Sequence, residues 1–280
     1  MHHTTTLIPM QTPDPADVPV VVLCGGQGTR IREASEKLPK PLISVGNQPI
    51  LWHIMKMYGS HGFRRFILCL GYKAWDIKQY FLQYETMMSD LRVGVGGDNH
   101  GSTEYLARET LDDWEVSLID TGMNTGTGGR LAHIAPLIDS DYFMVTYGDG
   151  LGDIDLSGEL AALARSDDLE GMVTGVHPTS RYGELGVDDT GLVTNFSEKP
   201  PSEGWVSGGF FAFRRSFLSE VPSDEPGHFF EQAPIQRLTH HRKLGLFPHT
   251  GFWMGMDTYR EYTALNEMWE TNQAPWKTWS

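Results

Sequence analysis

The feature that most constrains the fold is a short apolar run, residues 20–24, that stops at two glycines, Gly25 and Gly26. Every residue of the run is apolar, and it begins with successive valines. A strand that is apolar at successive positions is typical of a parallel sheet covered on both faces. Residues 50–58 then repeat apolar side chains at helical spacing, and residues 66–70 form a second apolar run. The sequence therefore predicts a βαβ unit at the start of the folded chain.

The rest of the chain divides into two halves with different patterns. A third strong strand is expected at residues 142–146, before Gly148, Asp149 and Gly150. We expect further helices at residues 75–84, 130–138, 156–165 and 258–269, and further strands at residues 172–176, 192–196 and 209–213. We therefore predict an α/β fold, with a doubly wound, mostly parallel, Rossmann-like sheet followed by a mixed α+β half. Residues 1–18 are expected to form a flexible arm, and residues 19–280 a single domain with halves 19–150 and 151–280.

The charge of the chain excludes two classes of partner. The 36 acidic and 22 basic residues give a formal net charge of −14, which repels nucleic acid and anionic membrane surfaces. The sequence has no apolar run of about 18 residues that could span a membrane, and its first residues lack the order of a secretory signal. We therefore expect a cytoplasmic protein. Cys24 and Cys69 lie inside apolar runs, which predicts buried thiols in preference to a disulfide.

The loop after the first strand has the composition of a phosphate-binding site. Its glycines let backbone N–H groups approach a phosphate or a base closely, and Arg30 adds a charged fork for phosphate oxygens. The loop lacks the ending of a P-loop, and Ile31 stands where a dinucleotide fingerprint requires a small residue. Lys40, held between Pro39 and Pro41, is a second candidate phosphate ligand. From this segment alone, a glycine-rich turn without a ligand is the alternative.

Short motifs follow this loop at intervals along the chain. They lie at residues 25–30, 39–41, 46–56, 71–73, 127–130, 147–150, 181–183, 198–200, 208–211, 256–258 and 274–277. In this order they resemble the sugar-phosphate nucleotidyltransferases, and most closely the glucose-1-phosphate cytidylyltransferases. Residues 124–130 differ from the glutamine-containing segment with which thymidylyl- and uridylyltransferases read the base. The chain departs from the family pattern at Leu38, where a lysine is usual, and at Ser207, where an asparagine is frequent.

The resemblance implies a role for each group of residues. Arg30, Lys40 and Lys199 would be the catalytic cations, and Asp149 and Asp257 would hold Mg²⁺. A nucleoside triphosphate, with CTP favoured, would bind Leu23, Gly25, Gly26, Gly28, Thr29, Arg30, Lys40, Thr127, Gly128, Gly129, Arg130 and Asp149. A sugar 1-phosphate would bind Tyr147, Gly148, Tyr182, Gly183, Glu198, Lys199, Ser207, Gly208, Gly209 and Trp253. The resembling enzymes form oligomers, so a homo-oligomer is also expected.

The implied reaction joins CTP to α-D-glucose 1-phosphate and yields CDP-glucose and pyrophosphate. A phosphomonoester loses its second proton at about pH 6, so the attacking sugar phosphate needs no general base. The barrier is to bring two polyanions together, because like unit charges about 4 Å apart repel by about 4 kcal/mol at an effective dielectric of about 20. Three alternatives stay open. They are the same transfer with another triphosphate or a modified hexose or heptose 1-phosphate, a regulator that binds nucleotide sugars without catalysis, and a nicotinamide-dependent oxidoreductase.

Overall fold

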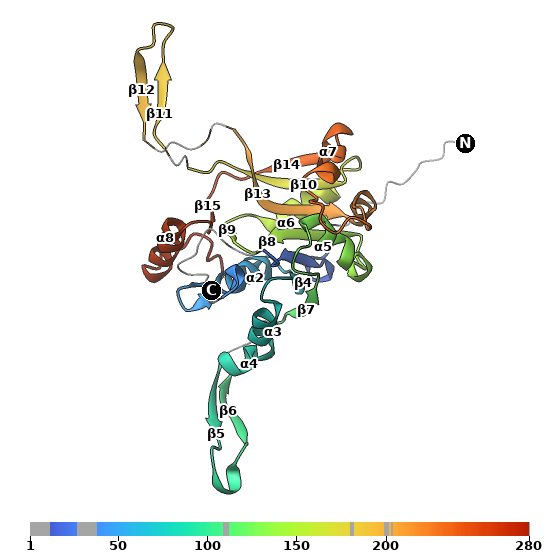
Figure 1. Cartoon of the computed structure of the whole chain (residues 1–280), viewed down its shortest axis with the longest axis vertical. Helices are drawn as coiled ribbons and strands as arrows, with labels where there is room; N and C mark the ends of the chain where they lie inside the picture. Colours follow the sequence, from blue (N-terminus) through green and yellow to red (C-terminus); the bar gives the residue numbers. More distant parts are fainter. Residues whose placement is uncertain are drawn as a thin grey trace, which may run out of the picture.

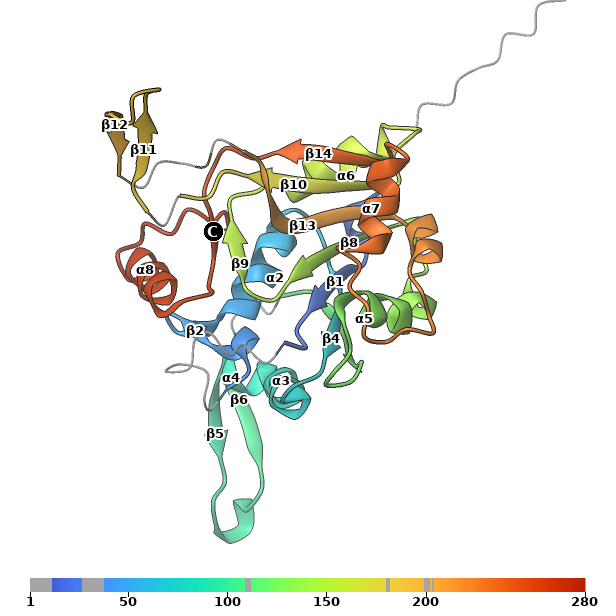
Figure 2. The ribbon, with the colours of Figure 1, turned by 45° about the horizontal axis from the view of Figure 1, so that its top comes forward.

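The computed structural model describes residues 12–26, 38–108, 112–179, 182–198, 202 and 204–279. Its main strands are β1 (Val20–Leu23), β4 (Arg65–Leu70), β7 (Glu115–Asp120), β8 (Tyr142–Tyr147), β10 (Gly171–Val176), β13 (Val206–Arg214) and β14 (Leu244–Pro248). They form one sheet in the order β14-β10-β13-β8-β1-β4-β7 (Figures 1 and 2). β13 is antiparallel to both of its neighbours, and the other pairs are parallel. The predicted mostly parallel α/β class is confirmed, and strands from both expected halves share this sheet.

Helices cover both faces of the sheet, which is why β1 is apolar at every position. On one face, Val20 and Val22 pack with the cluster that includes α2 (Ile50–Ser60), α3 (Ala74–Leu82) and α6 (Leu156–Ala164). On the other face, Val21 and Leu23 pack with α5 (Thr127–Ile134) and α7 (Ala233–His240). The central strand is thus buried on both sides, and the loop that follows it must emerge at the edge of the sheet.

Short elements complete the described fold. The short helical turns are η1 (Pro15–Asp17), η2 (Lys40–Leu42), η3 (Gly97–Asn99), η4 (Ala135–Leu137), η5 (Arg215–Glu220) and α4 (Tyr84–Met87). A small hairpin pairs β2 (Ser44–Val45) with β3 (Gln48–Pro49), and a two-stranded antiparallel sheet pairs β9 (Gly150–Gly152) with the distant β15 (Trp253–Gly255). Of the expected N-terminal arm, residues 1–11 lie outside the described residues, whereas Val18 is buried in the core. The folded chain therefore begins before the expected boundary at residue 19.

Two further hairpins project from opposite ends of the body (Figure 1). One pairs β5 (Ser89–Val93) with β6 (Thr103–Arg108), and the other pairs β11 (Glu184–Val187) with β12 (Val193–Ser197). We call them the β5–β6 arm and the β11–β12 arm. Of these four strands, the sequence predicted only β12, because the other three combine polar and apolar residues without a buried face.

The C-terminal segment is attached to the body through aromatic side chains. α8 (Tyr259–Glu270) begins with a capping box made by Thr258 and Glu261, at the place predicted for the last helix. Beyond α8, the fully buried Trp276 donates a hydrogen bond from Nε1 to Nδ1 of His53 in α2, at 3.4 Å. Burial lowers the pKa of His53 to about 4, so this ring is neutral near pH 7. Within the described residues, no helix has the length and apolar character needed to cross a membrane.

The two cysteines are buried, as predicted, and neither forms a disulfide. Cys24 follows β1 and Cys69 lies in the neighbouring strand β4, where the backbone N–H of Cys24 donates to the carbonyl of Cys69. Burial raises the pKa of the Cys24 thiol and raises that of Cys69 to about 12. Both thiols are therefore protonated and unreactive near neutral pH.

Candidate functional site

A cavity of about 480 Å³ opens at the carboxyl ends of β1 and β8, where an open α/β sheet binds its ligands. We call it the nucleotide cavity. Leu23, Gly25 and Gly26 enter it from β1 and its loop, and Tyr147, Gly148 and Asp149 from β8 and its turn. Among the residues expected to bind nucleotide, its lining includes Leu23, Gly25, Gly26, Lys40, Thr127, Arg130 and Asp149.

Lys40 lies between two aspartates at one side of this cavity. Its Nζ is 2.6 Å from Oδ2 of Asp149 and 2.9 Å from Oδ1 of Asp257. Only 13% of the lysine side chain is exposed, against 33% and 41% for the two carboxylates. Burial alone would lower the pKa of Lys40, but the charge and hydrogen bond of Asp149, followed by those of Asp257, raise it. Lys40 is therefore a charged ammonium that neutralises part of the carboxylate pair.

A strand pair brings these aspartates together from distant parts of the sequence. β9 begins directly after Asp149, and β15 ends two residues before Asp257. The two strands pair with Gly150 opposite Gly255, and the backbone N–H of Met256 donates to the carbonyl of Asp149 at 2.8 Å. The β9–β15 pair therefore fixes the spacing of the carboxylates through the backbone.

A second cavity of about 200 Å³ adjoins the first and shares Tyr147, Asp149 and Asp257 with it. We call it the sugar cavity. Its lining also includes Ser207, Gly208, Gly209 and Trp253, all of which were expected to bind the sugar phosphate. Trp253 is held by a hydrogen bond from Nε1 to the carbonyl of Gly208, at 2.8 Å. The two cavities therefore meet at the aspartate pair.

Arg130 lines the nucleotide cavity and also holds the ends of three strands beneath it. Its guanidinium is buried and donates to the carbonyl of Leu70, to Oγ1 of Thr121 and to the carbonyl of Gly25, at 2.8, 2.5 and 3.3 Å. Leu70 is the last residue of β4, Thr121 directly follows β7, and Gly25 lies two residues after the end of β1. A Cβ atom at Gly25 would lie 2.0 Å from Cζ of Arg130. Arg130 thus binds the strand ends under the glycine loop, and its described hydrogen bonds are made to the protein.

Gly128 and Gly129, which were expected to bind nucleotide, line neither cavity. Their backbone N–H groups donate to the carbonyl of His228, at 3.1 and 3.4 Å. A Cβ atom at Gly128 would lie 2.1 Å from Nε2 of His228, and one at Gly129 would lie 2.2 Å from the carbonyl oxygen of Pro226. These glycines therefore let segment 226–228 pack on the start of α5, and the segment takes up donors that a phosphate would otherwise use.

The carboxylate of Glu231 links Thr127, at the start of α5, to Tyr147, at the end of β8. It accepts hydrogen bonds from Oγ1 of Thr127 and from the hydroxyl of Tyr147. Burial, together with the negative charge of Glu231, raises the pKa of Tyr147, so this hydroxyl keeps its proton and donates. Sequence reasoning assigned Glu231 no role. The lining residues of the nucleotide cavity that were assigned no binding role are Cys24, Pro41, Met123, Asn124, Thr125, Gly126, Gly227 and Phe229.

The remaining predicted residues lie elsewhere or are not described. Tyr182, Gly183 and Glu198 belong to the base of the β11–β12 arm and line neither cavity. At Gly183, a Cβ atom would lie 2.9 Å from the ring of Phe196, so this glycine accommodates packing within the arm. Gly28, Thr29, Arg30 and Lys199 lie outside the described residues.

The aspartate pair has the composition of a magnesium site completed by substrate. Among the described residues, no group of three or more His, Cys, Asp or Glu side chains gathers as a metal site. Mg²⁺ commonly binds one or two carboxylates and takes its other ligands from water and substrate phosphates. Asp149 and Asp257 already hold a cation, the ammonium of Lys40, between them. The carboxylates therefore fit a divalent ion whose remaining ligands come from the substrates.

Comparisons with known proteins agree with this geometry. Residues 19–271 match the family model described as Nucleotidyl transferase. The chain is 39% identical to a glucose-1-phosphate cytidylyltransferase of Salmonella typhi over 92% of this chain and 98% of the relative. It is 26% identical to a D-glycero-alpha-D-manno-heptose 1-phosphate guanylyltransferase of Campylobacter jejuni over 75% of this chain and 82% of that protein. The crystal structure of HddC from Yersinia pseudotuberculosis complexed with GMP-PN shares the fold, with a TM-score of 0.63, 23% identity, and coverage of 90% and 99% of the two chains.

Proposed function

Because the chain belongs to the nucleotidyl transferase family, we propose that it joins CTP to glucose 1-phosphate, yielding CDP-glucose and pyrophosphate. The observation that carries the proposal is the meeting of two cavities at Asp149 and Asp257. One cavity accepts the triphosphate, and the other accepts the sugar phosphate. The attacking oxygen and the α-phosphorus then meet at the shared boundary.

The cavity residues position the substrates and offset their charge. Leu23, Met123 and Phe229 give the nucleotide cavity apolar surface for a base, and the backbone at Gly25 and Gly26 can approach it closely. In the sugar cavity, Trp253 offers a rigid apolar face to a sugar ring. Bound between the carboxylates, Mg²⁺ would neutralise charge on the phosphates. The protein contributes by positioning and electrostatic stabilisation, and no protein base is required.

The choice of CTP and glucose rests on the cytidylyltransferase relative of Salmonella typhi. We further propose that the enzyme works in the cytoplasm, where reducing conditions suit its free cysteines. A pyrophosphate-release assay of CTP, UTP, dTTP, GTP and ATP against glucose, mannose and heptose 1-phosphates tests the substrate assignment. We expect the highest kcat/KM for CTP with glucose 1-phosphate. A tenfold higher value for another pair would reassign the substrates, and no release with any pair would remove the proposed activity.

The aspartate pair gives the first mutational prediction. We expect Asp149→Asn and Asp257→Asn each to lower kcat by at least about 10²-fold, because each removes a charge from a preorganised electrostatic site. The matched control is Asp153→Asn, in a carboxylate that pairs with His249 at 3.1 Å and lines neither cavity. Pyrophosphate release over a Mg²⁺ titration, with thermal unfolding as a check of folding, provides the measurement. Activity of either test variant within about threefold of wild type would exclude that aspartate from the metal site.

A further inference from the structure

The ammonium of Lys40 occupies the space between the two carboxylates that a metal ion would need. Its Nζ approaches one oxygen of Asp149 and one of Asp257, and the lysine also lines the nucleotide cavity. The three groups together carry a net charge of −1, with two carboxylates against one ammonium. This arrangement is a cation site, and in the described conformation a protein side chain serves as its cation.

Lys40 and a divalent ion cannot both use these oxygens in this arrangement. Mg²⁺ binds carboxylate oxygens at about 2.0–2.1 Å, inside the hydrogen-bond distances that Nζ makes to the same pair. The two cations would also repel each other at close range. Binding of a metal through these two oxygens therefore requires Lys40 to leave one or both carboxylates.

The backbone around Lys40 leaves only the side chain to move. The N–H of Leu42 donates to the carbonyl of Pro39 at 2.8 Å, and that of Ile43 donates to the carbonyl of Lys40 at 3.1 Å. Pro41 and Leu42 are buried in the turn η2. The long lysine side chain can still rotate about its own bonds from the aspartates toward the nucleotide cavity, where phosphates of a bound nucleotide would provide a new anionic partner.

We propose that Lys40 and the divalent cation compete for Asp149 and Asp257, and that the nucleotide relieves this competition by attracting Lys40 to its phosphates. The inference rests on the proposed function, because it takes the aspartate pair as the metal site. Without nucleotide, Lys40 closes the pair and weakens metal binding. With nucleotide, the same lysine binds phosphate, so metal and nucleotide strengthen each other's binding.

Direct measurement of Mn²⁺ binding tests the competition without an activity assay. Electron paramagnetic resonance detects free Mn²⁺ during titration of the full chain, alone and with saturating CTP but no sugar phosphate. We expect Lys40→Met to bind Mn²⁺ alone about tenfold more tightly than wild type, because the competing charge-assisted hydrogen bonds are gone. CTP should also strengthen Mn²⁺ binding less in this variant. The ratio of the Mn²⁺ affinity with CTP to that without CTP should be about tenfold smaller than in wild type. Lys40→Gln, which keeps a polar side chain, is the second test if Lys40→Met does not fold.

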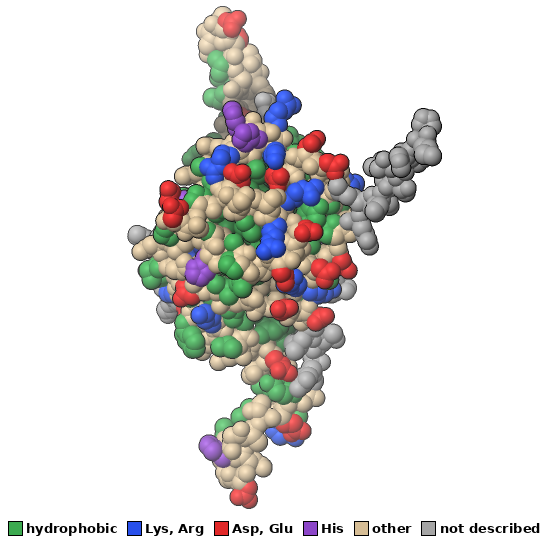
Figure 3. Space-filling model, turned by 90° about the vertical axis from the view of Figure 1, so that its right-hand side faces the viewer, with side chains coloured by type: hydrophobic (Ala, Val, Ile, Leu, Met, Phe, Trp, Pro, Cys, Tyr) green, Lys and Arg blue, Asp and Glu red, His purple; other side chains and the backbone are tan. Residues whose placement is uncertain are grey.

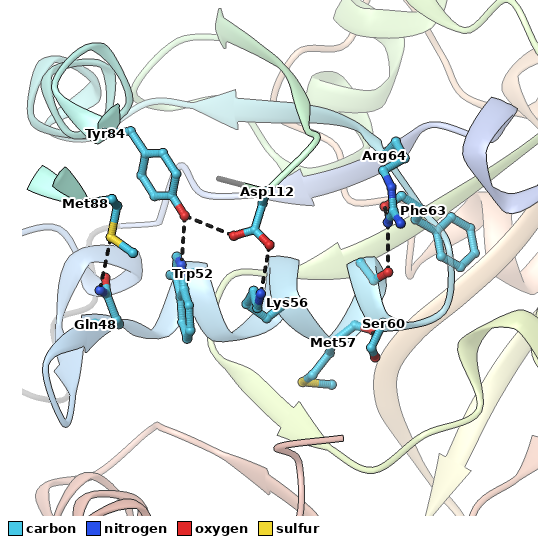
Figure 4. Close-up of polar contacts among 11 residues, drawn as sticks. Gln48, Trp52, Lys56, Met57, Ser60, Phe63, Arg64, Tyr84, Met88 and Asp112 are labelled. Carbon is cyan, nitrogen blue, oxygen red and sulfur yellow. Dashed lines mark hydrogen bonds and ion pairs between the residues drawn. The ribbon is translucent and has the colours of Figure 1, made fainter. Parts of the chain in front are cut away.

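Lys56 supplies a matched control. Its Nζ pairs with Oδ1 of Asp112 at 2.7 Å, and both side chains are partly buried. Figure 4 shows this pair beside Tyr84, whose hydroxyl donates to the other oxygen of Asp112. Neither Lys56 nor Asp112 lines the nucleotide or the sugar cavity. Lys56→Met therefore removes a similar ion pair, and we expect it to leave Mn²⁺ affinity unchanged.

The outcomes separate the competition from the function on which it rests. Asp149→Asn and Asp257→Asn should both weaken Mn²⁺ binding with CTP present. If they do so while both Lys40 variants bind Mn²⁺ alone no more tightly than wild type, the competition is wrong and the metal site stands. If neither aspartate variant changes Mn²⁺ binding, the metal site and the competition both fail. If Lys56→Met raised the Mn²⁺ affinity as much as Lys40→Met, the effect would come from the loss of any positive charge on the protein. That result would also overturn the competition.

Discussion

Glu159 is a buried acid that lies outside both cavities. It belongs to the first turn of α6 and has no exposed surface. Burial raises its pKa to about 8 from the ordinary value of 4.5, and both carboxylate oxygens are buried without a hydrogen-bond partner among the described residues. Burial of Tyr58 raises the pKa of its own hydroxyl, and ionisation of Glu159 would add to that shift. The core beneath β10 therefore accepts Glu159 as a neutral acid and resists its ionisation.

This glutamate gives stability a specific pH dependence. Between about pH 4.5 and pH 8, the unfolded chain releases the Glu159 proton while the folded chain keeps it, so the free energy of unfolding falls as pH rises. One pKa unit corresponds to about 1.4 kcal/mol, so the fall across this window is about 4–5 kcal/mol. Glu159→Gln stays neutral and should lose that component. Urea unfolding at pH 5, 6.5 and 8 should show the variant gaining stability relative to wild type as pH rises.

The exposed Glu267 on α8 is the control for this measurement. Glu267→Gln should follow the wild-type pH profile, because this side chain is exposed on the surface of α8. If the profiles of Glu159→Gln and wild type stay parallel from pH 5 to pH 8, Glu159 is not the source of the pH dependence.

At the scale of elements, segment 226–228 can pack against the start of α5 only because the residues there are glycines without side chains. The backbone N–H of Gly126 donates to the carbonyl of Pro226 at 2.8 Å, and Gly129 packs directly against that carbonyl. We expect Gly129→Ala to lower the free energy of unfolding by about 1–3 kcal/mol, because a methyl group 2.2 Å from a backbone oxygen forces the segment to move. Chemical denaturation measures this loss directly.

Gly96 provides the comparison for this glycine. It follows β5 in the β5–β6 arm, its backbone is extended, and an added Cβ would meet no atom within 4 Å. Gly96→Ala should change stability by less than about 0.5 kcal/mol. Equal losses in the two variants would contradict the packing explanation and would point to a general effect of replacing glycine.

The sequence predicted the central strands, because a strand that is buried on both faces is a continuous run of apolar residues. The runs at residues 20–24, 66–70 and 142–146 became β1, β4 and β8, and the helical spacing at residues 50–58 became α2. Most strands of the arms were missed, because a hairpin such as β5–β6 buries neither face and has no regular apolar pattern. Periodicity reports which side chains are buried, so it cannot report elements that stand in solvent.

The site was predicted less completely, for a related reason. Motifs identified Lys40, Asp149 and Asp257, but their ion pairs depend on the pairing of β9 with β15, which no local pattern encodes. Gly128 and Gly129 indicated that something approaches the start of α5 closely. In the structure it is segment 226–228, through the ring of His228 at Gly128 and the backbone of Pro226 at Gly129. A glycine predicts a close approach without naming the approaching group.

For the whole molecule, the two arms present an unusual surface. Leu185 pairs with Phe196 and Val187 pairs with Val193 across the β11–β12 arm, so all four side chains lie on one face. They are 56–64% exposed, and Figure 3 shows hydrophobic side chains on both projecting arms. A two-stranded hairpin by itself is at best marginally stable in water. We therefore propose that neighbouring copies of the chain cover this face in a homo-oligomer.

Replacing one residue on each face of the β11–β12 arm tests this proposal. Light scattering after size exclusion should give wild type a mass that is a multiple of 31.4 kDa. Val193→Lys should lower that mass, because it places an unpaired charge in the covered apolar face. Asn195 pairs with Gly186 on the opposite face, so Asn195→Lys adds the same charge and should leave the assembly intact. A wild-type mass of one chain at micromolar concentration would contradict the assembly. Equal dissociation of both variants would contradict the assignment of the interface to the face that carries Leu185, Val187, Val193 and Phe196.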